Sequence, residues 1–221
     1  MSAGWGSVLG QLLAPAMVVA ISPFSIIAAV VLVLHTDRPT PNGLAFLSGR
    51  LIGLAAITAV FIQAPRLVSG FDRPISPWVL IAVGAILLAL GLWVWARRDR
   101  MTEEPRWLSS ISRMTPVGAG VIGALLVLTN PKMLAANAAA GILIGTAGLG
   151  LAGAGAAVAY YSAVASSTVA VPVLAYVAVG ARADDHLTRL KEWLHRHSGH
   201  VTGVILVLVA IIVLYTGIRG L

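Results

Sequence analysis

Long apolar stretches without charges dominate this chain and restrict it to folds that a lipid bilayer can hold. An α-helix needs roughly 20 apolar residues to cross the hydrocarbon core of a membrane, and about six stretches approach or exceed that length. Hydrophobic residues make up 58% of the 221 residues and charged residues only 10%, so we expect no separate soluble domain. The sequence predicts an all-α polytopic membrane protein with spans near residues 8–34, 43–63, 75–96, 116–143, 154–179 and 201–218.

The first apolar stretch is expected to be a membrane span and not a cleavable signal peptide. Residues 1–7 contain no Lys or Arg, and the stretch that follows is much longer than the apolar core of a signal peptide. The chain also contains no cysteine. Disulfides, thiolate metal ligands and cysteine nucleophiles are therefore excluded.

The basic residues of the predicted loops fall mostly on one side of the membrane. That side carries Arg38, Arg97, Arg98, Arg100, Arg106, Arg113, Arg182, Arg189, Lys191 and Arg196, and the other side carries Arg66, Arg73 and Arg219. The positive-inside rule makes the first side cytoplasmic. We therefore expect the inner (cytoplasmic) membrane, with both termini outside the cytoplasm. The net charge of +7 is then explained by contact with anionic membrane lipids, and no nucleic-acid partner is expected.

Two proline motifs divide the chain into similar halves. The first predicted span contains Ser22-Pro23 and the fourth contains Asn130-Pro131, each near the middle of a long apolar run. Each half supplies three spans, so the second half enters the membrane in the opposite direction, as in an inverted-topology repeat. We predict a 3+3 architecture with helices 1 and 4 broken. Its parts are a first repeat at 1–96, a cytoplasmic connector at 97–115 and a second repeat at 116–221, which includes an amphipathic segment at 182–198.

The paired breaks predict a shared polar site. A proline inside a helix removes one backbone donor and leaves the carbonyl one turn earlier without its partner, and inside a membrane such a carbonyl must face protein or a water-filled cavity. Polar side chains surround both motifs. The candidate substrate-binding residues are Ser22, Pro23, Ser25, Arg50, Thr129, Asn130, Pro131, Lys132 and Asn137.

Two of these candidates, Arg50 and Lys132, are cations within predicted spans, where a charge is costly unless it is paired or solvated. Arg50 has an alternative interpretation, in which its side chain extends to the cytoplasmic headgroups. All eight carboxylates fall in predicted loops. A cationic site without an internal acid favours an anionic ligand, gives no sign of proton coupling and offers no base or nucleophile for an enzyme. We expect no catalytic residues, no metal and no cofactor.

The fifth predicted span leaves two questions open. Its start, Gly145–Gly155, is equally compatible with a loop, a re-entrant segment or the beginning of a helix. Its polar side chains around Pro172 predict either hydrogen bonds between helices or a substrate path. They are Tyr160, Tyr161, Ser162, Ser166, Ser167, Thr168 and Tyr176.

The motifs Ile21–Ser25 (ISPFS), Leu128–Leu134 (LTNPKML) and Ser48–Gly53 (SGRLIG), together with the six-span layout, resemble the LysE superfamily of exporters. Within it, the chain is most similar to the mycobacterial GAP group of peptidoglycolipid and sulfolipid addressing proteins. The resemblance covers the whole chain and implies export or surface delivery of large glycolipids in actinobacteria. It also implies oligomers such as a homodimer, and partners such as lipid synthases and larger lipid transporters. The two proline motifs and Lys132 correspond to the family's paired broken helices.

The sequence thus predicts a transporter, or a transport accessory, that moves a glycolipid with an anionic or sugar-bearing headgroup towards the cell surface. Two alternatives stay open. One is a LysE-type exporter of amino acids or small cations, which the superfamily also contains. The other is a membrane scaffold that assembles lipid-synthesis enzymes without transporting anything.

Overall fold

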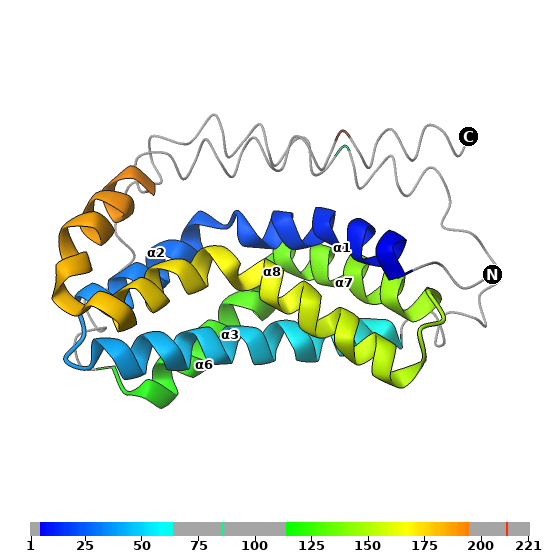
Figure 1. Ribbon diagram of the computed structural model, residues 1–221, viewed down its shortest axis with the longest axis horizontal. Coiled ribbons are helices and arrows are strands. Elements are labelled where there is room, and N and C mark those ends of the chain that lie inside the picture. The colour runs from blue at the N-terminus through cyan, green and yellow to red at the C-terminus, as the bar shows by residue number, and fades with distance from the viewer. Residues whose placement is uncertain (1–4, 64–84, 86–113, 195–210, 212–221) are drawn as a thin grey trace. The chain divides into compact units, whose positions relative to one another are not determined.

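A computed structural model describes residues 5–63, 85, 114–194 and 211 of the chain. Within these ranges the ordered structure is entirely helical (Figure 1). The helices are α1 (Trp5–Ala20), α2 (Pro23–Leu34), α3 (Pro39–Ile62), α6 (Pro116–Thr129), α7 (Pro131–Thr146) and α8 (Gly150–Val179), followed by the short 3₁₀ helix η3 (Gly180–Ala183).

The helices have the length and apolar surface of membrane spans. Two helices, Pro39–Ile62 and the long helix Gly150–Leu194, are each long and apolar enough to cross a membrane. The bent pairs α1–α2 and α6–α7 bring the number of candidate spans to four if each pair forms one span. Large apolar side chains point outward, among them Ile52, Val60 and Val171, each more than 60% exposed. The described part is therefore a membrane protein with two to four spans. The third and sixth predicted spans lie outside the described residues.

Both predicted breaks are present, and both use the same backbone arrangement. Ser22 and Asn130 have extended backbone angles, with φ of −108° and −91°, and each stands directly before a proline that begins the next helix. A proline forces the preceding residue out of the helical region and suits the first position of a helix, where its missing N–H costs nothing. Each pair is bent by more than 40°.

A short turn joins α7 to α8 within the segment Gly145–Gly155, for which the sequence left a loop, a re-entrant segment and a helix start open. α7 ends at Thr146, and α8 begins at Gly150. Gly148 and Gly150 have φ of +67° and +68°, a left-handed conformation that side-chain-bearing residues rarely adopt. The segment is therefore the end of one helix, a tight turn and the start of the next.

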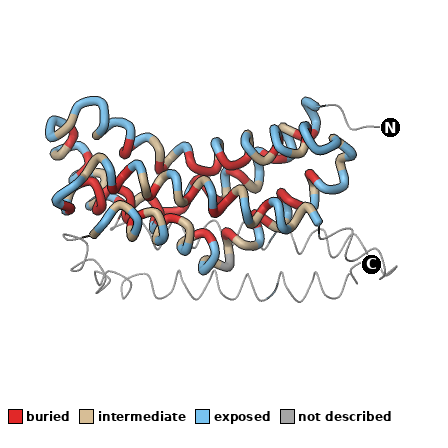
Figure 2. Tube along the Cα trace, turned by 90° about the horizontal axis from the view of Figure 1, so that it is seen from below, coloured by how far each residue is buried: buried red, intermediate tan, exposed pale blue. Residues whose placement is uncertain are grey.

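The helices pack in a crossed pairing between the two halves. α3, from the first half, lies along α6 and α7, whereas α8, from the second half, lies along α1 and α2. The core contains one face of α1, with Val8, Leu12, Ala16 and Val19, together with residues of α3, α6, α7 and α8. Figure 2 shows the buried positions gathered where the helices face one another. The broken helix of each half thus packs on the unbroken helix of the other half.

Glycines make the contacts of α3 with α6 and α7 very close. A Cβ atom at Gly49 would collide with the carbonyl of Gly120, and one at Gly53 would lie 3.1 Å from the Cα atom of Ala124. On α7, a Cβ at Gly145 would lie 2.6 Å from the Ile62 carbonyl oxygen. Small residues at such positions allow helix backbones to approach in a membrane, where packing drives association.

The predicted amphipathic segment at 182–198 is helical where the structure describes it. Residues 184–194 are α-helical, with Leu187 and Leu194 buried while His186, Arg189 and Trp193 are exposed. Leu187 and Leu194 are seven residues apart and therefore lie on the same face of the helix. The other faces are left for polar side chains, as in an amphipathic helix. Residues 195–198 lie outside the described part.

Candidate functional site

The first break leaves several backbone carbonyls without their usual helical partners. Pro23 has no N–H to donate to the carbonyl of Val19, four residues earlier. The N–H of Ser25 would ordinarily reach the carbonyl of Ile21 but instead donates to the carbonyl of Ser22. Ala20 ends α1, and its carbonyl accepts a bond from the N–H of Ser22, 2.8 Å away, in place of the usual helical partner.

Three side chains from three other helices donate to three consecutive carbonyls at this break. Arg50 of α3 donates from Nη2 to the oxygen of Val19, 3.3 Å away. Thr168 of α8 donates from Oγ1 to the oxygen of Ala20. Lys132 of α7 donates from Nζ to the oxygen of Ile21, 3.3 Å away. The break is therefore held by donors from both halves of the chain.

Lys132 also brings the two breaks together. It follows Pro131 directly, at the start of α7, and its backbone N–H donates to the side-chain oxygen of Asn130, 3.1 Å away. Its ammonium group reaches the carbonyl just before Ser22. We call this meeting point, formed by Ile21, Ser22, Asn130 and Lys132, the break junction.

The structure separates the predicted site residues by accessibility. Ser22, Ser25, Arg50 and Asn137 are buried, with exposed fractions of 2%, 1%, 0% and 0%. Asn130 and Lys132 are half-buried and Thr129 is exposed. Ile21, at 39%, and Phe24, at 53%, expose apolar side chains on either side of the first break. A ligand can therefore reach Lys132 from outside the bundle, whereas Arg50 is enclosed within it.

Arg50 lies in the centre of the bundle and does not extend to the headgroups, so that alternative is wrong. Its Nη1 donates to Ser25 Oγ, 2.8 Å away, and its Nη2 also donates to the carbonyl oxygen of Ala165, 3.3 Å away. It thereby links α3 to the first break and to α8. Arg50 and Lys132 donate to carbonyls two residues apart, those of Val19 and Ile21, so two cations meet at the first break.

Asn137 belongs to a different contact. Its side-chain oxygen accepts a hydrogen bond from Thr58 Oγ1 of α3, 3.0 Å away, and its amide group donates to the carbonyl oxygen of Met133, 2.7 Å away. This pair connects α7 to α3 and does not reach the break junction. Thr129 likewise donates to the Leu125 carbonyl of its own helix.

Two residues outside the predicted site set contribute to these contacts. Thr168 was one member of the polar stripe of the fifth span, and its bond to the Ala20 carbonyl supports the interhelical alternative for that residue. The sequence around Thr58 does not indicate that this residue makes a contact between helices, because a single threonine in an apolar span is common. Only the rotation of α3 against α7 shows that it faces Asn137.

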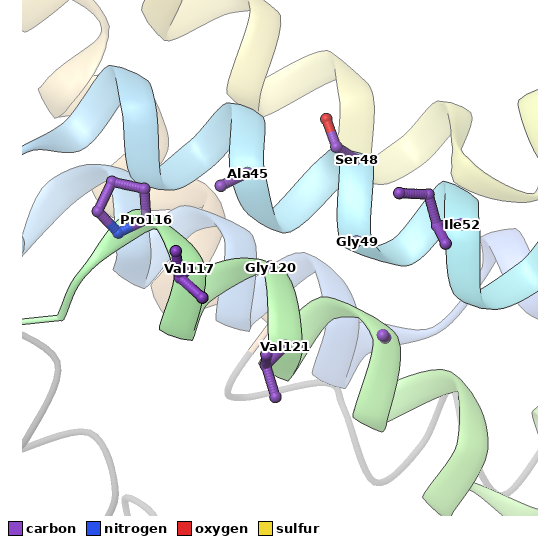
Figure 3. A pocket seen from close by; sticks show the side chains of 9 residues that line it. Ala45, Ser48, Gly49, Ile52, Pro116, Val117, Gly120 and Val121 are labelled. Carbon is purple, nitrogen blue, oxygen red and sulfur yellow. The ribbon is translucent and has the colours of Figure 1, made fainter.

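The outer side of the contact between α3 and α6 contains a shallow groove of about 470 Å³ (Figure 3). Ala45, Ser48 and Ile52 line it from α3, and Val117 and Val121 line it from α6. Among the residues that the structure describes, none that lines the groove carries a charge. The groove therefore does not suit an anionic headgroup.

The charge of the described helices is entirely positive near the breaks. The carboxylates within residues 5–63 and 114–194 are Asp37, Asp184, Asp185 and Glu192, and none of them lies in α1–α3 or α6–α8. The break junction therefore offers an accessible ammonium group, the Asn130 amide and break-exposed backbone, without a competing acid. Ammonium and amide groups can donate hydrogen bonds to anionic or hydroxyl-rich groups, and a backbone carbonyl can accept one from a hydroxyl.

The chain was compared with known proteins and protein families. Neither the curated proteins nor the solved structures gave a match. A family model did match, over residues 12–219, and its description is Sap, sulfolipid-1-addressing protein. Because this match covers nearly the whole chain, the protein belongs to the sulfolipid-1-addressing protein family.

Proposed function

We propose that this protein delivers a glycolipid with an anionic or sugar-bearing headgroup from the cytoplasmic membrane towards the cell surface, either as the transporter or as an accessory to one. The family description names a sulfolipid, which combines a sugar with a sulfate ester. The observation that carries the proposal is the accessible ammonium group of Lys132 at the junction of two broken helices.

In the proposed mechanism, Lys132 exchanges its bond to the Ile21 carbonyl for a bond to the headgroup. A charge-assisted bond between an ammonium and a sulfate oxygen is stronger than one to a neutral carbonyl. The Asn130 amide and the Ile21 carbonyl, released by this exchange, then bind sugar hydroxyls. The exposed apolar side chains of Ile21 and Phe24 leave the acyl chains in contact with lipid.

For the whole chain we propose the 3+3 inverted repeat of the LysE superfamily, in the inner membrane with both termini outside. The crossed packing supports this architecture. In the repeat, α1–α2 corresponds to α6–α7 and α3 corresponds to α8. The contacts of α3 with α6 and α7 then have their counterpart in the contacts of α8 with α1 and α2. Movement of one repeat against the other would then give alternating access to the break junction. A homodimer, lipid synthases and larger lipid transporters remain proposed partners, and no enzymatic activity is proposed.

The test is comparative lipidomics of cell-surface extracts from strains with and without the gene. We expect the surface amount of one anionic glycolipid class to fall in the deletion strain, while its intracellular precursor accumulates. Restoring the gene should restore the surface lipid. Total phospholipid serves as the control and should stay unchanged.

Two outcomes would contradict the proposal. If surface lipids are unchanged and a soluble amino acid accumulates inside the cell, the protein is a small-molecule exporter. If the precursor itself is no longer made, the protein supports synthesis as a scaffold.

A further inference from the structure

The interior around Arg50 contains polar groups that protein contacts leave incomplete. The side chain is 0% exposed, and a guanidinium carries five N–H donors and remains charged in proteins. Among the described residues its hydrogen-bond partners are neutral: Ser25 Oγ and the carbonyls of Val19 and Ala165. Its Nε donor has no hydrogen-bond partner among the described residues.

Two serines of α8, the helix whose Ala165 carbonyl accepts a bond from Arg50, also have hydroxyls without a partner among the described residues. Ser162 and Ser166 are 4% and 2% exposed, and neither hydroxyl has a hydrogen-bond partner in the described part of the chain. These serines lie one helical turn apart and flank Ala165, whose carbonyl accepts a bond from Arg50. Buried polar groups in folded proteins are nearly always bonded to protein, to water or to an ion.

The incomplete groups favour an anion over a cation. The Nε–H of Arg50 can only donate. A serine hydroxyl can donate or accept, and next to a guanidinium its donor suits a negative ligand. Lys132 bonds the Ile21 carbonyl of the same break that Arg50 contacts at Val19, which adds a second positive charge. No carboxylate lies in α1–α3 or α6–α8 to balance either charge. A buried charge without a partner is costly in any protein interior.

We propose that Arg50, with the hydroxyls of Ser162 and Ser166, binds one small inorganic anion of the chloride class between α3 and α8. The three side chains are each at most 4% exposed, so the ligand is a free ion and not the headgroup of a membrane lipid. The ion neutralises the guanidinium at the point where Arg50 holds the first break. This site is separate from the break junction and does not depend on the lipid proposed as cargo.

The test measures thermal unfolding of the purified full-length protein in nanodiscs of neutral phosphatidylcholine. Sodium chloride replaces sodium gluconate at constant ionic strength, and bromide is tested in a parallel series. In the wild type we expect Tm to rise with chloride and with bromide and then to saturate. In S162A/S166A the half-saturating chloride concentration should rise at least about tenfold, because two donors to a charged ligand are lost.

The matched control is S167A. Ser167 neighbours the same site on α8, but it is exposed and its hydroxyl donates to the carbonyl of Val164. This variant should keep the chloride response of the wild type. The proposal is overturned if gluconate and chloride give equal Tm values in the wild type. It is also overturned if S162A/S166A responds like S167A, or if only anionic lipids raise Tm.

Discussion

At the scale of residues, the first break depends on donors that come from distant parts of the chain. Arg50, Thr168 and Lys132 donate to the carbonyls of Val19, Ala20 and Ile21. The need for such donors could be predicted, because a proline always leaves carbonyls unpaired. Their identity could not, because it depends on how α3, α7 and α8 are rotated about their axes.

Replacement of Arg50 should destabilise the protein strongly. In R50Q, the Val19 and Ala165 carbonyls and Ser25 lose a charged donor while remaining buried. We expect the free energy of unfolding to fall by about 2 kcal/mol or more, since buried groups that lose a partner cost about 1–3 kcal/mol each. Unfolding by SDS titration in mixed micelles, followed by circular dichroism, measures this change.

The control for that experiment is R38Q. Arg38 is exposed at the N-cap of α3, and surface substitutions usually change stability by no more than about 0.5 kcal/mol. Equal stability of R50Q and R38Q would show that the Arg50 contacts contribute nothing to the fold.

At the scale of helices, glycines determine how closely the two halves pack. Gly49 and Gly53, at the four-residue spacing that favours close helix contacts in membranes, lie against Gly120 and Ala124. The partner helix could not be predicted from the sequence. Many small residues occur in α6, α7 and α8, and only three-dimensional packing decides which of them faces α3.

The Gly49 contact gives a prediction with a built-in comparison. In G49A the added methyl group meets the backbone carbonyl of Gly120, which side-chain movement cannot relieve. We expect G49A to lower the free energy of unfolding by about 1–3 kcal/mol, as overpacked sites do. G155A, on α8, meets nothing within 4 Å and should be neutral or stabilising by up to about 1 kcal/mol. Equal loss of stability in both variants would contradict the packing described for α3 and α6.

At the scale of the whole molecule, hydropathy and the proline motifs predicted the broken and unbroken helices of the described part well. The predicted first, second, fourth and fifth spans correspond to α1–α2, α3, α6–α7 and α8. The sequence could not distinguish the enclosed cation, Arg50, from the accessible one, Lys132, because both lie in apolar helices. The full six-span count, the repeat and the orientation of the termini stay predictions.

The measurement that tests the account most directly is glycolipid export by Lys132 variants, expressed in a deletion strain and matched for protein level. K132A removes the accessible charge at the break junction, and K132R keeps it. We expect K132A to lower surface glycolipid at least about tenfold and K132R to retain most of it, because a charge-assisted bond contributes about 1.5–3 kcal/mol. T146V, which removes an exposed hydroxyl that bonds carbonyls within α7, serves as the control for a polar substitution on the same helix and should export like the wild type. Equal export by K132A and K132R would contradict a headgroup site at the break junction.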